Sequence, residues 1–251
     1  MGTEISATGE KMKKLGRLIL ITAALCLPHG DCAQETKTRI RLTENSDWWS
    51  GLRTEDADVG KTQEREVPDS NFQIAGIKLE EGFFEQATKK LGRTTVVERG
   101  DAAGGRAQAC YVSSDSGNRV YLIFEQGEVF GYFYLFSGGK AWKGQDLCAA
   151  SDQVNWKTST ASGLRLGLTQ DQVIAILGKP SLRRKDQLLY SLRVTKKYTE
   201  EDLKTVRKNI PNISEEELHR NYEYYDWSAG LDFKFEESKL TFLAVSWAET
   251  N

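Results

Sequence analysis

The stretch GLRLGLTQDQVIAILGKPS, residues 163–181, contains a complete short helix with a marked start and a marked stop. Thr169 is a good N-terminal cap, and Gln172 completes a capping box three residues later. Gly178 suits the left-handed position after a helix, and Pro180 prevents the helix from continuing. The stretch therefore predicts a helix from about residue 170 to residue 177, and it contains no evident catalytic side chain.

The apolar residues of this helix lie on one face at helical spacing: Val173, Ile176 and Leu177. A second stretch, KLEEGFFEQATKKLG at 78–92, has the same design, with its apolar face formed by Phe83, Phe84, Ala87 and Leu91. Both helices end in Leu-Gly followed by a basic residue. One helical unit therefore occurs twice in the chain.

Each helix is followed by alternating or apolar runs that predict strands. After the first helix these runs are TTVVE, AQACYVS, NRVYLIFE and EVFGYFYLF, and after the second they are LRRK, QLLYSLRV, GLDFKFEE and KLTFLAVSW. We therefore expect an α+β fold of two tandem repeats, each a short helix or helical pair on one face of an antiparallel sheet of about four strands.

The same patterns divide the chain into five parts. They are a signal peptide at 1–33, an extended polar arm or linker at 34–70, repeat 1 at 71–138, a linker at 139–162 and repeat 2 at 163–251. Repeat 2 contains a polar insertion near 196–221, which we expect to form short helices broken at Pro211.

The leader has the layout of a secretory signal. Lys13, Lys14 and Arg17 precede an apolar core at 18–27, which is too short to span a bilayer, and cleavage is expected near Cys32 or Ala33. Leu25 before Cys26 and Asp31 before Cys32 are poor lipobox residues. The expected location is periplasmic or secreted, lipid anchoring is disfavoured, and the true start stays open between Met1 and Met12.

Two cysteines, Cys110 and Cys148, remain after the leader is removed. In an oxidising compartment such a pair indicates one disulfide. It would close a loop of about 38 residues, which corresponds to roughly 4 kcal/mol in the chain-entropy model. The alternative is two separate buried thiols.

Composition excludes several functions. The net charge of −2 without a basic cluster disfavours a nucleic-acid partner, and the mature chain has no apolar run that could span a membrane. His219 is the only histidine after the leader, so a multi-histidine metal site is excluded, and its polar helical surroundings indicate a surface residue. We expect no metal, no cofactor and no enzymatic activity; a hydrolase with paired carboxylates is a distant alternative.

Strand alternation assigns the two faces of the sheet, if two-residue turns pair Phe124 with Val129 and Phe235 with Leu240. The face toward the helices then carries Val120, Leu122, Phe124, Val129, Gly131, Phe133 and Leu135, with Leu231, Phe233, Phe235, Leu240, Phe242, Ala244 and Ser246. The outer face carries Tyr121, Ile123, Phe130, Tyr132, Tyr134 and Phe136, with Asp232, Lys234, Thr241, Leu243, Val245 and Trp247.

The aromatic outer face is the predicted functional surface, because a sheet covered on one side is normally polar on the other. Tyr and Trp favour protein recognition. The expected partner-binding residues are Tyr121, Phe130, Tyr132, Tyr134, Phe136 and Trp247, together with Trp48 and Trp49 of the polar arm. The alternatives are that the arm covers this face, that a homodimer forms through it, or that its rings stack on a glycan or other small molecule.

The opening stretch also resembles SmpA/OmlA (BamE-like) domains, whose pattern is G-(M/L)-T-x-x-(E/Q)-V-x-x-(L/I)-L-G-x-P. The tandem arrangement resembles the beta-lactamase inhibitor protein fold, in which two helix-plus-four-strand repeats share a concave sheet. The first copy departs from the pattern, with Arg93-Thr94 where Lys179-Pro180 stands. The resemblance implies a non-enzymatic envelope or secreted protein that binds a protein partner, without indicating which one.

Overall fold

The structure, a computed structural model, describes residues 39–42, 60–79, 82–99, 105–115, 117–127, 130–138 and 144–250. The chain divides into residues 1–36 and 37–251, and every described residue belongs to the second part. The predicted signal peptide and the tryptophans Trp48 and Trp49 therefore lie outside the described residues.

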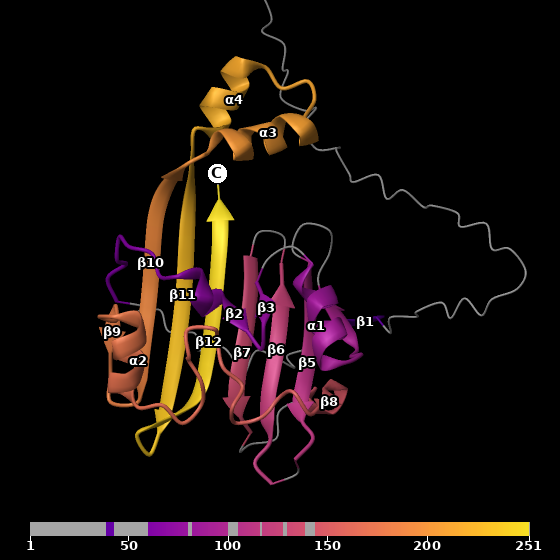
Figure 1. The fold of residues 1–251 in the computed structure, drawn as a ribbon, viewed down its shortest axis with the longest axis vertical. Helices are drawn as coiled ribbons and strands as arrows, with labels where there is room; N and C mark the ends of the chain where they lie inside the picture. The colour runs from indigo at the N-terminus through magenta and orange to yellow at the C-terminus, as the bar shows by residue number, and fades with distance from the viewer. Residues whose placement is uncertain are drawn as a thin grey trace, which may run out of the picture. The chain divides into compact units, whose positions relative to one another are not determined.

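The described chain is built around one large sheet (Figure 1). Its strands and those of a separate small hairpin are β1 (Arg39–Leu42), β2 (Gln73–Ile74), β3 (Ile77–Lys78), β4 (Val96–Arg99), β5 (Arg106–Ser113), β6 (Val120–Gln126), β7 (Phe130–Ser137), β8 (Ala149–Ser151), β9 (Leu182–Arg183), β10 (Gln187–Lys197), β11 (Tyr224–Glu236) and β12 (Lys239–Thr250). The helices are α1 (Phe83–Leu91), α2 (Gln170–Leu177), α3 (Glu200–Asn209) and α4 (Glu215–Tyr222), with short 3-10 helices η2 (Asp69–Phe72) and η3 (Gln145–Leu147).

The strand order of the large sheet is β1-β4-β5-β6-β7-β12-β11-β10-β9, with β8 beside β5, and β2 and β3 form the hairpin. Most neighbouring strands are antiparallel; β1 and β8 pair in parallel with β4 and β5. Helices α1 and α2 and the β2–β3 hairpin lie on the same side of the sheet (Figure 1). The α+β class expected from the sequence is confirmed.

Two halves meet in the middle of this sheet. Each has a helix followed by four strands, α1 with β4 to β7 and α2 with β9 to β12. The halves join through β7 and β12, where Phe133 pairs with Val245 and Leu135 with Leu243. Because both joining strands are the last of their half, the second half continues the sheet of the first.

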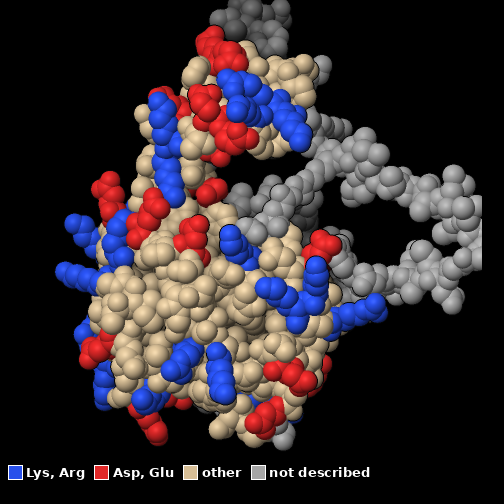
Figure 2. Space-filling view, in the orientation of Figure 1, with Lys and Arg blue, Asp and Glu red and all other residues tan. Residues whose placement is uncertain are grey.

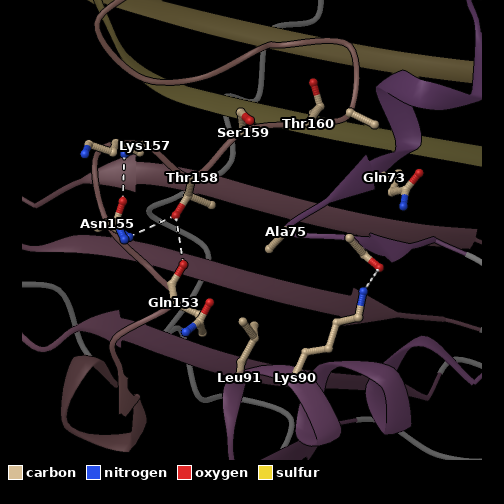
Figure 3. A pocket seen from close by; sticks show the side chains of 12 residues that line it. Gln73, Ala75, Lys90, Leu91, Gln153, Asn155, Lys157, Thr158, Ser159 and Thr160 are labelled. Carbon is tan, nitrogen blue, oxygen red and sulfur yellow. Dashed lines mark hydrogen bonds between the residues drawn. The ribbon is translucent and has the colours of Figure 1, made fainter.

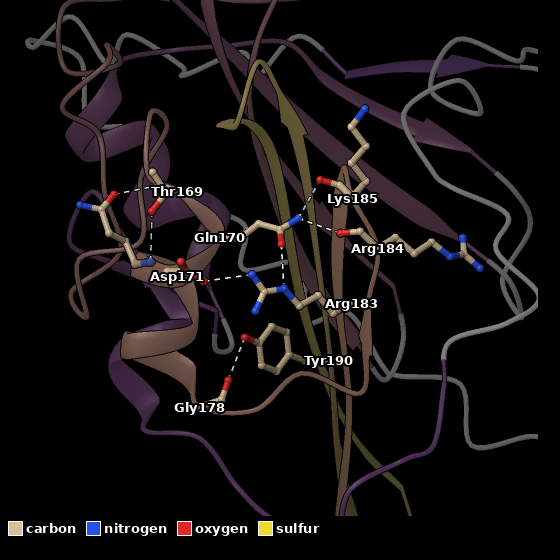
Figure 4. Close-up of polar contacts among 9 residues, drawn as sticks. Thr169, Gln170, Asp171, Gly178, Arg183, Arg184, Lys185 and Tyr190 are labelled. Atoms are coloured by element: carbon tan, nitrogen blue, oxygen red, sulfur yellow. Dashed lines mark hydrogen bonds and ion pairs between the residues drawn. The ribbon is translucent and has the colours of Figure 1, made fainter.

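Helix α2 has the start and stop that residues 163–181 predict. The capping box of Thr169 and Gln172 is present, and Gly178 has a φ of +77°. In the first turn the side chain of Gln170 donates to the carbonyls of Arg184 and Lys185 at 2.8 and 3.1 Å (Figure 4). The beginning of α2 therefore also fixes the turn between β9 and β10.

A buried tyrosine binds the end of each helix. The Tyr190 hydroxyl of β10 donates to the carbonyl of Gly178 at 3.0 Å (Figure 4), and the Tyr111 hydroxyl of β5 donates to that of Gly92 at 3.2 Å. Burial raises the pKa of both tyrosines to about 12. The glycine that ends each helix therefore accepts a hydrogen bond from the second strand of its own half, β5 in the first half and β10 in the second.

The main core lies between the sheet and the layer of helices. It combines Phe83, Ala87 and Leu91 of α1 with Val173 and Leu177 of α2 and with one face of the central strands. The segment after β8 also packs there, through its buried residues Val154, Leu164 and Leu166. Apolar burial of this kind is the main stabilising term of such a layered fold.

Helices α3 and α4 occur where the sequence predicts a helical insertion, at the end of the long strands β10 and β11 (Figure 1). Each begins with a capping box, at Thr199 and at Ser214. Leu203 of α3 and Leu218 of α4 are buried, and Lys, Arg, Asp and Glu side chains intermingle on the surface of these helices (Figure 2). Within the described part of the chain, none of the helices has the length and apolarity needed to cross a membrane.

Candidate functional site

The candidate site is the outer face of the sheet, opposite α1 and α2. Alternation along β6 and β7 divides their side chains as expected, because Leu122, Phe124 and Phe133 join the main core while Tyr121, Ile123 and Tyr134 form a separate cluster. Phe124 pairs with Phe133, so the predicted pairing of Phe124 with Val129 is wrong. Gln126 pairs with Gly131, and this longer turn leaves the face assignment of the described residues unchanged.

The face assignment of β12 is wrong beyond Leu240. Phe235 pairs with Leu240 as predicted, but Lys234 pairs with Phe242, and this shift in register is a β-bulge around Thr241. One extra residue reverses the alternation of the rest of the strand. Phe242, Ala244 and Ser246 therefore lie on the outer face, and Leu243, Val245 and Trp247 lie on the helix side.

Trp247 is accordingly not on the predicted surface. Its ring packs against the main core, and its Nε1 donates to the carbonyl of Leu79, just before α1. Phe242 takes an outer position in its place, next to Tyr134 and Phe136, with ring centroids 6.4 and 6.2 Å away.

The outer face carries an aromatic cluster on the first half and the adjoining strand β12. It consists of Tyr121, Ile123, Tyr134, Phe136 and Phe242 with the adjoining Cys110. The rings of Tyr121 and Phe136 are stacked, with centroids 5.1 Å apart and planes 17° apart. Tyr121, Tyr134 and Phe136 are only 3%, 4% and 6% exposed. These three predicted partner-binding residues are therefore buried and do not form an open surface in this structure.

Two other predicted residues, Phe130 and Tyr132, remain half-buried at the edge of this cluster. Their rings meet edge to face with centroids 5.0 Å apart, and Tyr132 is stacked on Tyr134 at 6.1 Å. The guanidinium of Arg106 lies 5.2 Å from the centre of the Phe130 ring. Phe130 and Tyr132 are thus the predicted aromatic residues that keep accessible surface on this face.

A buried polar group lies beside these rings. The carboxylate of Glu125 is fully buried and accepts hydrogen bonds from Gln108 Nε2 at 2.6 Å and from the Tyr134 hydroxyl at 3.5 Å. Arg106 Nη1 lies 3.4 Å from its other oxygen. Because a buried charge is costly unless paired, these contacts fix the positions of three neighbouring strands relative to one another. The sequence gives no signal for this group, since its members come together only through strand register.

The disulfide between Cys110 and Cys148 is present, which confirms the predicted pairing. Cys110 belongs to the aromatic cluster, and Cys148 directly precedes β8. The bond therefore attaches the segment around β8 to β5 at the aromatic end of the outer face.

The outer face of the second half has a different character. Its inner strands carry small and polar residues that are all partly exposed: Ser228, Gly230, Asp232, Lys234, Ala244 and Ser246. Gln187 Nε2 donates to Asp232 at 3.0 Å, and Lys234 Nζ lies 4.6 Å from the centre of the Phe242 ring. We name these six residues the polar floor. It is partly solvated and adjacent to Tyr132 through the pairing of Tyr132 with Ser246.

An ion pair borders the polar floor. Arg193 of β10 binds the carboxylate of Asp226 of β11, which also accepts a hydrogen bond from Thr195 at 2.7 Å. The hydrogen bonds from Arg193 and Thr195 lower the pKa of Asp226, so its carboxylate stays ionised. Within the described residues, three or more His, Cys, Asp or Glu side chains nowhere gather as they would around a metal ion.

Comparisons with protein-family models, with curated proteins and with solved structures find no significant match to this chain. The proposed function therefore rests on the residues of the outer face.

Proposed function

We propose that this chain is an exported, non-enzymatic module that binds another protein through the outer face of its sheet. The observation that carries the proposal is the polar floor together with the adjoining Phe130 and Tyr132. Both α1 and α2 lie on the opposite face of the sheet (Figure 1). The proposed surface is therefore a broad, regular part of the fold that the helix layer leaves accessible.

The composition of this surface suits protein recognition. Small residues such as Gly230, Ala244 and Ser246 let a partner approach the strands closely, and the half-buried Tyr132 offers a rigid amphipathic ring beside them. Lys234 and the Arg193–Asp226 pair add fixed charges, which contribute specificity more than affinity.

Two further features support the exported, two-repeat part of the proposal. A structural disulfide is typical of proteins in oxidising compartments, which agrees with the predicted leader. The shared order of helix and strands, with a tyrosine bound to the glycine at each helix end, supports two repeats of one unit. In this proposal the resemblance of residues 163–181 to SmpA/OmlA domains, and of the arrangement to the beta-lactamase inhibitor protein fold, reflects a shared role in protein binding.

The glycan-binding alternative through the aromatic face is less well supported. Stacking on a sugar needs open ring faces, and Tyr121, Tyr134 and Phe136 are buried. A homodimer through the polar floor is the other alternative, and it is an outcome of the test below.

Site-specific photo-crosslinking in the producing cell tests the proposal. A photoreactive phenylalanine analogue replaces Lys234 or Ser246 on the polar floor, and Ala175 on the exposed side of α2 is the matched control. We expect one discrete adduct with a different protein from both floor positions and none from Ala175. Adducts only from Ala175, no adduct at all, or an adduct only with a second copy of this chain would contradict the proposal.

A further inference from the structure

A pocket of about 540 Å³ lies on the helix side of the sheet, away from the proposed protein-binding face. Its walls are the end of α1, the β2–β3 turn and the segment 153–161 (Figure 3). Leu91 and Ala75 provide a small apolar part, and most of the remaining lining is amide and hydroxyl groups. Its volume lies in the range of pockets that bind small molecules.

Among the described residues that line the pocket, the charged side chains are those of two lysines, Lys90 and Lys157. Other Lys and Arg side chains gather over α1 on the same side of the molecule (Figure 2). The local potential therefore favours a negatively charged ligand. Gln73, Gln153 and Asn155 add amide groups that can donate to and accept from hydroxyls.

The β2–β3 turn that forms one wall is shaped around Lys90. The ammonium of Lys90 donates to the carbonyl of Gly76 (Figure 3). Gly76 has a φ of +70°, and a β-carbon there would lie 2.5 Å from Lys90 Nζ. Its neighbour Ala75 also lies in the left-handed region, with a φ of +49°, which is unfavourable for alanine. Positive φ at both central residues is the geometry that a two-residue hairpin turn requires, so this wall is a rigid part of the β2–β3 hairpin.

The opposite wall is held by its own hydrogen bonds. Thr158 Oγ1 accepts from the backbone N–H of Asn155 at 2.9 Å, and the Asn155 side-chain oxygen accepts from the N–H of Lys157 at 2.8 Å (Figure 3). Backbone hydrogen bonds from Ala75 to Ser159 and from Ala161 to Gln73 join the two walls. The pocket is therefore preformed, which lowers the cost of ordering it around a ligand.

We infer that this pocket binds a small acidic carbohydrate, whose carboxylate is attracted by the positive charge of its lysines and whose hydroxyls meet the amide and hydroxyl lining. This goes beyond the proposed protein-binding function, because it uses the opposite side of the sheet and a different class of ligand.

Calorimetric titration of the mature chain tests the inference, with cellobiuronic acid and cellobiose as probes that differ in one carboxylate. We expect binding of the acidic disaccharide alone, weakened about tenfold or more in Lys90→Gln/Lys157→Gln because the pocket loses two positive charges. Gly76→Ala, which displaces Lys90, should weaken binding as well. Lys89→Gln, an exposed lysine on the same helix outside the pocket, is the matched control and should leave binding unchanged.

Circular dichroism verifies that each variant is folded, and amide chemical shifts locate the ligand. Shifts at Ala75, Lys90 and Ser159 support the inference. Absence of binding, equal binding of cellobiose, or an equal loss in Lys89→Gln would overturn it.

Discussion

The helix side of the sheet is built alike in the two halves, whereas the outer side differs. On the helix side Tyr111 pairs with Leu122 and binds Gly92, and Tyr190 pairs with Leu231 and binds Gly178. Each tyrosine ring also meets a phenylalanine of the next strand edge to face, Phe124 at 6.5 Å and Phe233 at 5.8 Å.

On the outer side the corresponding positions have different chemistry. The half with the aromatic cluster has Tyr121 and the disulfide-bonded Cys110, whereas the half with the polar floor has Gly230 and Leu189. Where the halves join, Tyr134 pairs with Ala244. The contacts that the halves share explain how a helix is fixed on the sheet, and the differences divide the outer face into a buried aromatic part and an accessible polar part.

The largest expected effects test whether the two halves contribute equally to the main core. Phe124→Ala and Phe233→Ala each remove a fully buried ring, and each should lower the free energy of unfolding by about 3–5 kcal/mol. Urea unfolding of the two variants measures this. A large loss for one and less than about 1 kcal/mol for the other would show that only one half holds the fold together.

The disulfide should stabilise the first half alone. For the 38-residue separation of Cys110 and Cys148, the chain-entropy model gives about 4 kcal/mol, so Cys110→Ala/Cys148→Ala should lose stability of that order. The loss should be matched by reducing the unmodified chain and should not increase when the double variant is treated with reductant. If the free energy of unfolding is unchanged in both experiments, the disulfide does not stabilise the first half.

The tyrosine contacts at the helix ends should have smaller and similar effects. Tyr111→Phe and Tyr190→Phe delete only the hydroxyl and leave the carbonyl of Gly92 or Gly178 without this donor, which should cost about 1 kcal/mol each. Thermal unfolding of both variants provides the comparison. A loss in only one variant would mean that the two helices are not held in the same way.

The same tyrosines should make the fold sensitive to alkali. Their pKa is raised from 10.0 to about 12 in the folded chain, so the unfolded chain loses these protons first. Their contribution is complete below pH 10 and is lost as pH rises through about 12. Between pH 9 and 11 the urea midpoint of the unmodified chain should fall more steeply with pH than that of Tyr111→Phe/Tyr190→Phe. If the two curves run parallel, the pKa of neither tyrosine is raised by folding.

Helix α2 could be predicted from residues 163–181 because its signals are local. Thr169, Gly178 and Pro180 act within a few residues of the helix that they bound. The disulfide followed from elimination, since only Cys110 and Cys148 remain after the leader.

The outer face could not be predicted fully, because it depends on strand register and on tertiary packing. The bulge around Thr241 reverses all later residues of β12, which moves Trp247 to the core side and Phe242 outward. Alternation correctly placed Tyr121 and Phe136 on the outer side but could not show that they are buried. The contact of Gln108 with Glu125 likewise depends on a pairing that neither strand encodes alone.

Hydroxyl-radical footprinting of the chain, alone and with the protein captured by crosslinking, tests whether the outer face is the binding surface. In the free chain Tyr132 should be oxidised readily, whereas Tyr121 and Tyr134 are protected by burial. The partner should protect Tyr132 and leave Trp156, which is 40% exposed in the segment after β8, unchanged. Protection of Trp156 with continued oxidation of Tyr132 would contradict the assignment of the outer face as the binding surface.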